Sequence, residues 1–176
     1  MMSFWPWFAA GSVLIVWFSW RVSIRAKRFH GIARFFAFEG ILALFLLNAH
    51  GWFRDPGSVL HLLSWGLLAG SAILVFGSIS RYFKSAAPSG QFENSTRLVE
   101  TGIYRYIRHP MYGSLILLGL GIYLKRVTAL TSALAGVVVL ALVLTALIEE
   151  GEMRARFGAE YAAYTRKTKR FIPFIF

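Results

Sequence analysis

The sequence contains no cysteine, which excludes disulfide bonds, thiolate zinc sites and a cysteine nucleophile. Histidine is also scarce. The four histidines, at positions 30, 50, 61 and 109, form no HxxxH or HExxH pair. Metal sites of the common helical type use such closely spaced histidines. We therefore expect no metal site in this chain.

Acidic residues are few as well, with 8 Asp and Glu against 19 Lys and Arg, which gives a formal net charge of +11. At 57 % hydrophobic residues and a mean hydropathy of +0.58, the chain is too apolar for an ordinary soluble fold. The basic residues are separated from the apolar runs, a distribution typical of membrane proteins. We therefore expect membrane lipids as partners and no nucleic acid.

Five apolar runs predict an all-α, polytopic membrane bundle of about five transmembrane helices, folded as a single domain over residues 1–176. The fourth run has only ~14 residues, or about 21 Å of helix, against a hydrocarbon core of about 30 Å. We therefore expect the polar segment before it to reach membrane depth and to line a cavity. The five runs are Phe4–Trp20, Ala33–Ala49, Val59–Tyr82, Met111–Leu124 and Thr128–Ile148.

Two features inside these runs are informative, a carboxylate and a set of glycines. Glu39 is a carboxylate in an apolar run, where an ionisable group is a functional candidate. Alternatively it lies near the helix end and pairs with Arg34 or Arg21. In the third run the glycines at positions 66, 70 and 77 are spaced for close contact between helices.

The distribution of Lys and Arg predicts the orientation. The loop after the first run, the loop before the fourth run and the C-terminal tail carry five, five and six of the 19 basic residues, and the other side carries three. By the positive-inside rule the basic side is cytoplasmic. We therefore expect a multi-pass membrane protein, in the inner membrane if the source is prokaryotic, with its C-terminal helical segment and active site facing the cytoplasm.

Two polar stretches share this basic side. Residues 98–113 (LVETGIYRYIRHPMYG) contain Pro110, which predicts the start of a helix. Arg108 and His109 should then lie at the positive end of the helix dipole, where an anion binds well. The second stretch, residues 149–170, begins with Glu149 and Glu150 and predicts an amphipathic helix that Gly158 could interrupt.

Together these stretches offer arginines, an imidazole, carboxylates and tyrosines. Such a set could hold a ligand that has both a cation and a carboxylate, because tyrosine faces attract cations and arginine grips anions. S-adenosylmethionine carries these groups. The alternative is that glutamates and arginines simply pair with one another at the lipid headgroups.

The motif L-V-x-x-G-x-Y-x-x-x-R-H-P-x-Y-x-S, which ends at Ser114, is followed by Glu149 and Glu150, by F-G-x-E-Y-x-x-Y ending at Tyr164, and by R-F-I-P. In this order the motifs resemble the isoprenylcysteine carboxyl methyltransferase family. They are also similar to the wider group of membrane methyltransferases that includes phospholipid N-methyltransferases. The resemblance covers about residues 95–176, and the first three apolar runs do not contribute to it.

The resemblance implies that residues 96–176 form a cofactor-binding methyltransferase core, preceded by three N-terminal spans in residues 1–95. S-adenosylmethionine would bind between the last two spans and the C-terminal segment. A lipophilic or lipid-anchored acceptor, bearing a carboxylate or an amine, would enter from the bilayer. The implied cofactor-binding residues are Gly102, Tyr104, His109, Pro110, Tyr112, Glu149, Glu150 and Tyr161.

The expected catalytic residues are Arg108, Glu150 and Arg154. Arg108 or Arg154 would hold the acceptor, and Glu150 or His109 would deprotonate it if it is an amine. Two rival functions are an NADPH-dependent reductase similar to the membrane sterol reductases, which share the Arg-His-Pro pattern, and a small non-enzymatic membrane protein.

Overall fold

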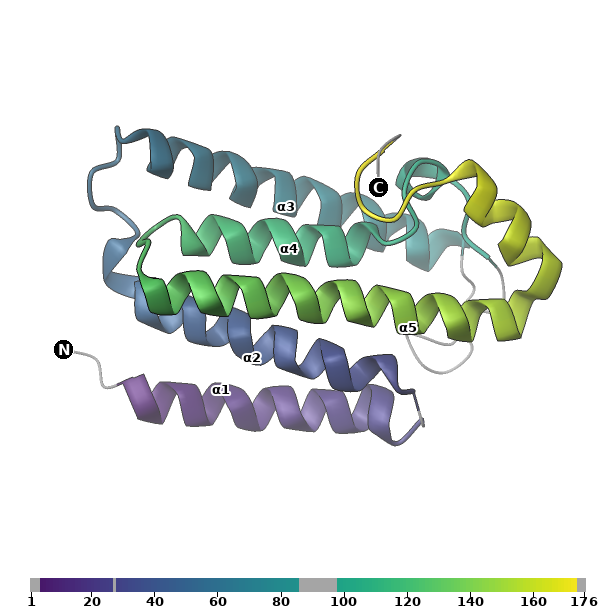
Figure 1. Ribbon diagram of the computed structural model, residues 1–176, viewed down its shortest axis with the longest axis horizontal. Coiled ribbons are helices and arrows are strands. Elements are labelled where there is room, and N and C mark those ends of the chain that lie inside the picture. Colours follow the sequence, from purple (N-terminus) through teal and green to yellow (C-terminus); the bar gives the residue numbers. More distant parts are fainter. Residues whose placement is uncertain (1–3, 27, 86–97, 174–176) are drawn as a thin grey trace.

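The computed structural model describes residues 4–26, 28–85 and 98–173, and five α-helices account for most of them. Figure 1 shows them as an elongated bundle with their long axes roughly aligned. In chain order the helices are α1 (Phe4–Ser19), α2 (His30–Asn48), α3 (Val59–Ser85), α4 (Pro110–Tyr123) and α5 (Ala129–Lys167). The prediction of an all-α, polytopic bundle is confirmed. Lys27 and Arg97, which the charge distribution includes, lie outside the described residues.

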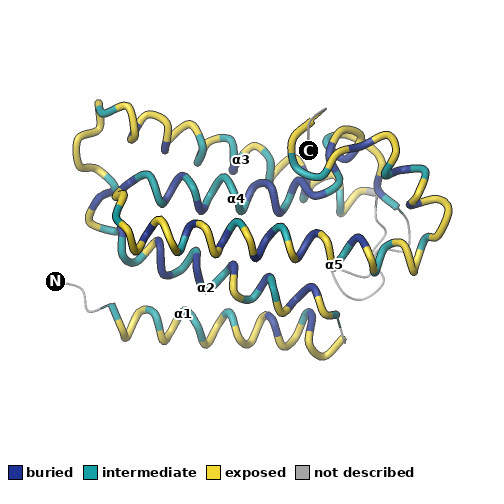
Figure 2. The backbone as a smooth tube through the Cα atoms, viewed as in Figure 1, coloured by how far each residue is buried: buried dark blue, intermediate teal, exposed yellow. Residues whose placement is uncertain are grey.

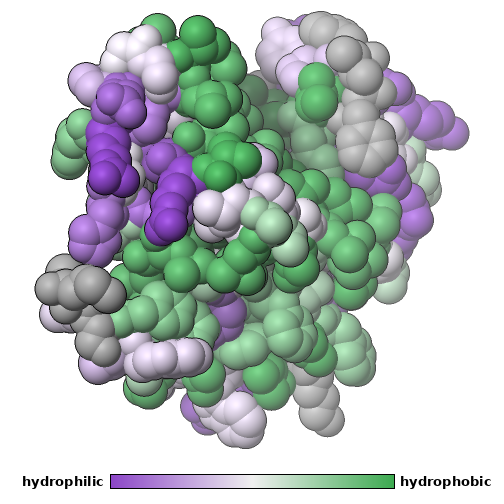
Figure 3. Space-filling view, turned by 60° about the vertical axis from the view of Figure 1, so that its left-hand side comes forward, coloured by the Kyte–Doolittle hydropathy of each residue, from purple (hydrophilic) through white to green (hydrophobic). Residues whose placement is uncertain are grey.

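Four segments are long and apolar enough to cross a membrane: Phe4–Ile24, His30–Gly51, Val59–Lys84 and Ala129–Lys167. The outward faces of α1 and α3 are exposed along most of their length (Figure 2), and they carry large apolar side chains such as Trp17 and Phe76. Hydrophobic atoms also cover much of the surface in Figure 3. Large exposed apolar surfaces of this kind fit contact with lipid. The protein is an integral membrane protein.

The core lies where α2 packs against α5 and α4 fills the space beside them. Ala37 and Leu44 of α2 belong to one buried cluster with Val138 and Leu142 of α5, and each of these four residues is at most 1 % exposed. Gly40 allows this close approach, because a Cβ atom there would lie 2.6 Å from Val138 Cγ2. α3 packs on α4, and α1 packs mainly on α2.

Helix α4 has 14 residues, the short length that the sequence predicts, and Pro110 is its first residue as expected. Helix α5 has 39 residues, or about 58 Å of helix. Its first part, residues 129–148, is long enough to cross the hydrocarbon core, and we treat the remainder as lying outside it. Gly158, with φ +53° and ψ −122°, breaks the helical geometry. The predicted interruption of the tail helix at this glycine is confirmed.

Beyond the kink the chain turns back over the bundle (Figure 1) and pairs with the segment before α4. The Arg108 N–H donates to the Lys169 carbonyl at 2.7 Å, and the His109 N–H donates to the Arg170 carbonyl at 3.0 Å. These bonds join residues about 60 positions apart in the sequence and bring the two polar stretches together.

Two sequence interpretations are wrong. Glu39 lies in the middle of α2 rather than near its end, and its Oε2 accepts a 2.7 Å hydrogen bond from the Ser12 hydroxyl of α1. Gly66 and Gly77 do not bring helices together, because no described atom lies within 4 Å of where their Cβ atoms would be. Both glycines are on the outward face of α3.

Candidate active site

The segment before α4 is shaped by its glycine and its proline. Gly102 has φ +63°, and a Cβ atom there would lie 2.8 Å from Arg81 Nε, so only glycine fits without strain. It begins the short 3-10 helix Gly102–Arg105. His109, just before Pro110, has non-helical backbone angles (φ −121°, ψ 57°) and is the N-cap of α4. The segment therefore places Arg108 and His109 side by side at the start of α4.

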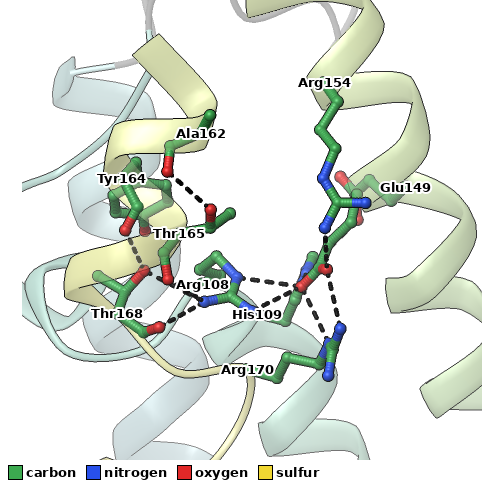
Figure 4. Close-up of polar contacts among 10 residues, drawn as sticks. Arg108, His109, Glu149, Arg154, Ala162, Tyr164, Thr165, Thr168 and Arg170 are labelled. Carbon is green, nitrogen blue, oxygen red and sulfur yellow. Dashed lines mark hydrogen bonds and ion pairs between the residues drawn. The ribbon is translucent and has the colours of Figure 1, made fainter. Parts of the chain in front are cut away.

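The centre of the site is the Glu150 side chain, of which only 1 % is exposed. Arg108 donates from Nε to Glu150 Oε1 at 3.0 Å, and Arg170 donates from Nε and Nη2 to its two oxygens at 3.1 and 3.2 Å. Arg154 reaches Oε2 at 3.5 Å from a side chain that is 59 % exposed. Figure 4 shows Arg108, Arg154 and Arg170 converging on this point from three segments.

This environment keeps Glu150 ionised. Burial by itself would raise its pKa, but the contact with His109, the hydrogen bonds from Arg170 and the positive charge of Arg108 outweigh burial and lower the pKa to about 2. A carboxylate with so low a pKa, and with arginines on both oxygens, is a poor proton acceptor. The geometry therefore disfavours Glu150 as a base.

Arg108 is occupied on every side. Besides its contacts to Glu150, its Nη1 donates to the carbonyl of Thr168, and the Thr165 carbonyl lies 3.4 Å away. Its guanidinium thus ties the start of α4 to α5 and to the returning C-terminal segment. The expectation that Arg108 grips the acceptor is not supported by this geometry, because its donors already point at groups of the protein.

His109 lies between the two adjacent glutamates. Its Nε2 is 3.4 Å from Glu150 Oε1, and its Nδ1 is 3.7 Å from Glu149 Oε2. The imidazole stacks on Tyr112, with 5.6 Å between ring centroids and 19° between ring planes. Both contacts to the carboxylates are longer than ordinary hydrogen bonds. The ring is held by packing while its nitrogens remain near acidic groups.

A pocket opens beside this network at the end of the bundle where α2 and α4 begin. Tyr164 helps to shape it, since its hydroxyl donates to the Tyr104 carbonyl at 2.7 Å. Burial raises the pKa of the Tyr104, Tyr161 and Tyr164 phenols, so they stay protonated. Seven of the predicted site residues line the pocket: Tyr104, Arg108, His109, Pro110, Tyr112, Glu149 and Tyr161. Gly102, Glu150 and Arg154 do not line it.

The sequence analysis missed a second group of lining residues. Arg28 lies just before α2, His30 and Arg34 lie in the first part of α2, and Glu152 and Arg156 come from α5. His30 Nδ1 lies 2.7 Å from Glu152 Oε2, which joins the start of α2 to α5. Arg170 begins the R-F-I-P motif, but it was not predicted as a site residue. One feature of the sequence could have indicated Arg28, His30 and Arg34. The loop after the first apolar run lies on the same basic side as the two polar stretches.

Fold and pocket together define an integral membrane protein with a polar site at one end of a helical bundle. The family model for phospholipid methyltransferases matches residues 59–160, which is more than half of the chain. The chain belongs to this family and is a membrane methyltransferase. A search of curated proteins found no match. Helices α1 and α2, with Arg28, His30 and Arg34, lie outside the matched residues.

Proposed function

We propose that the protein transfers a methyl group from S-adenosylmethionine to a lipophilic acceptor that reaches the pocket from the bilayer. The observation that supports this most directly is the pocket itself. It combines carboxylates, basic side chains and tyrosine rings at one end of a membrane bundle that belongs to a methyltransferase family. The family implies a methyl donor, and these residues suit S-adenosylmethionine.

The donor's groups each have a counterpart among the lining residues. Glu149, with a side chain 24 % exposed, can accept hydrogen bonds from an ammonium or from ribose hydroxyls. The faces of Tyr104, Tyr112 and Tyr161 can stabilise a sulfonium, because an aromatic ring attracts cations to its face. Glu150 does not line the pocket, and we assign it to positioning Arg108, Arg170 and His109.

When bound, S-adenosylmethionine supplies a methyl group on a positively charged sulfur, which a lone pair of the acceptor attacks in line. A carboxylate acceptor already has such a lone pair, so the residues of the pocket need only orient it. An ammonium acceptor has to lose a proton first. His109 is suited to take that proton, since it lines the pocket and its Nδ1 and Nε2 lie 3.7 and 3.4 Å from the Glu149 and Glu150 carboxylates.

The family's name indicates a phospholipid, so a lipid amine is the first acceptor to test, and a prenylcysteine-like carboxylate is the second. The positive-inside rule supports a pocket that faces the cytoplasm. Reporter fusions after Phe176 and in the turn that follows Gly51 test this sidedness. They should report opposite sides of the membrane, and the same side for both would contradict it.

The proposed reaction is tested with the detergent-purified protein, methyl-labelled S-adenosylmethionine and a membrane lipid extract. Label should pass into the organic phase, and its mobility should identify the acceptor as an amine or a carboxylate. His109→Ala is the matched control, and it should be inactive if the acceptor is an amine, because the group that takes its proton is then lost. Binding of NADPH in place of S-adenosylmethionine would contradict the proposal and favour a reductase.

A further inference from the structure

We propose that Arg34, with Arg28 and Arg156 at the outer rim, binds an anionic oxygen group of the acceptor, either a phosphate or a carboxylate. This assignment rests on the proposed function, because it assumes that donor and acceptor meet in this pocket. It gives a role to α1 and α2, which lie outside the residues matched by the family.

Arg34 is a buried cation that lines the pocket. Only 7 % of the residue is exposed, and its Nη2 donates to the Ser23 hydroxyl at 2.6 Å. Its guanidinium carbon lies 5.8 Å from the ring centroid of Phe18 and 5.9 Å from that of Phe38. An ionisable group inside a membrane helix is a functional candidate, and the place of Arg34 in the wall of a pocket supports such a role.

The end of α1 is built to hold this arginine. Residues Trp20–Ile24 form a π-helix, a rare conformation that is frequent at functional sites. It turns Ser23, which is completely buried, toward Arg34. Gly31 makes the fit possible, because a Cβ atom there would lie 2.1 Å from Ser23 Cβ. The backbone of both segments is therefore adapted to one side-chain position.

The contact between His30 and Glu152 places the arginines along the path of an incoming headgroup. Arg34 lies one turn after His30 on α2, and Arg156 lies one turn after Glu152 on α5. Because α2 runs into the bilayer and α5 runs out of it here, Arg34 is on the membrane side of the contact and Arg156 is on the outer side. An amphiphile with its tail in the bilayer would bring its anion to Arg34 first.

The chemistry of the three side chains selects an oxyanion. A guanidinium offers parallel N–H donors that match phosphate and carboxylate oxygens, and flanking aromatic rings fix its plane. Glu152 lines this part of the pocket, and its carboxylate lies 2.7 Å from His30 Nδ1. The donor side of the pocket contains Glu149 instead, which suits the cationic groups of the methyl donor.

Calorimetric titration of the full-length protein in detergent tests this site with three probes. Dihexanoyl phosphatidate carries a phosphate, N-lauroylglycine carries a carboxylate, and dihexanoylglycerol is uncharged. At least one anionic probe should bind, and the better one identifies the acceptor's anion. Arg34→Lys should weaken that binding about ten- to a hundredfold, because the fork is lost while the charge remains. Arg156→Gln should weaken it by no more than about fivefold, because this side chain is exposed.

Arg166→Gln is the matched control, since Arg166 is exposed on α5 and does not line the pocket. It should leave the binding of the anionic probe unchanged. Absence of anionic-probe binding, or unchanged binding of the probe in a folded Arg34→Lys protein, would overturn the proposal. S-adenosylmethionine affinity should be the same in all three variants, and its loss in a folded Arg34→Lys protein would assign Arg34 to the donor. If the unmodified protein binds no S-adenosylmethionine, the proposed function fails, and the anionic probes still decide the anion site.

Discussion

Two buried charges at opposite ends of the bundle are stabilised in different ways. At the pocket end the Glu150 carboxylate contacts Arg108, Arg170 and Arg154. At the other end Lys125 is 3 % exposed, and its Nζ lies 3.6 Å from the centroid of the Trp65 ring. Among the described residues this ammonium has no hydrogen-bond partner. Burial lowers the pKa of the Lys125 amine.

The comparison separates a network that positions groups from a contact that covers a charge. Hydrogen bonds between Glu150 and the arginines fix directions, so they hold three segments in one arrangement. A cation above an aromatic face is attracted without a fixed direction. The buried carboxylate at the pocket end therefore has directional bonds, whereas the Lys125 ammonium at the opposite end is covered by the rings of Trp65 and Trp52.

The largest effect is expected at the charged network. Glu150→Gln keeps the shape of the side chain but leaves Arg108 and Arg170 without their anion. Removing one partner of a buried ion pair costs about 3–5 kcal/mol, so we expect a lower unfolding temperature and the loss of methyl transfer. Thermal unfolding and single-turnover transfer in detergent measure both. If the unfolding temperature and methyl transfer were both unchanged, the network would have no part in stability or in positioning the pocket residues.

A pair of variants sharpens the comparison within the network. Arg108→Lys replaces a buried guanidinium whose three nitrogens all contact groups of the protein, and we expect a loss on the order of 1.5–3 kcal/mol in the free energy of unfolding. Arg154→Lys changes an exposed contact to the same carboxylate and should cost no more than about 1 kcal/mol. Denaturant titrations of the two variants give the difference. Equal costs would contradict the distinction between buried and exposed partners.

How far the sequence could predict this structure depends on the range of each interaction. The five apolar runs, the short α4, the start at Pro110 and the kink at Gly158 follow from local composition and were predicted. The particular partners of Glu150 were not predicted, because Arg108 and Arg170 reach it only through the packing of α4 and the turn after α5.

The second group of lining residues depends on contacts that the sequence does not encode locally. His30 meets Glu152 across 122 positions, and this contact exists only because α2 packs against α5. The partner of Glu39 was missed for the same reason, since the register of α1 against α2 decides that Ser12 faces it. A pattern of apolar residues specifies which face of a helix is buried, but it does not specify which neighbour covers it.

The smallest effect is expected at the far end of the bundle. Lys125→Met replaces a buried ammonium by an apolar chain of similar length, and such replacements are often neutral or stabilising by about 1 kcal/mol or more. Methyl transfer should be unchanged, because Lys125 is at the end of α4 opposite to His109. Loss of transfer in a folded Lys125→Met protein would mean that the two ends are coupled.

Photocrosslinking tests the central claim most directly, because it reports where the methyl donor binds. The purified protein is irradiated with labelled S-adenosylmethionine, and the labelled peptides are identified by mass spectrometry. The account predicts label in residues 98–113 and 149–164, which contain Tyr104, Tyr112 and Tyr161, and its loss when unlabelled S-adenosylmethionine competes. Label confined to other segments, or label that NADPH displaces and S-adenosylmethionine does not, would contradict it.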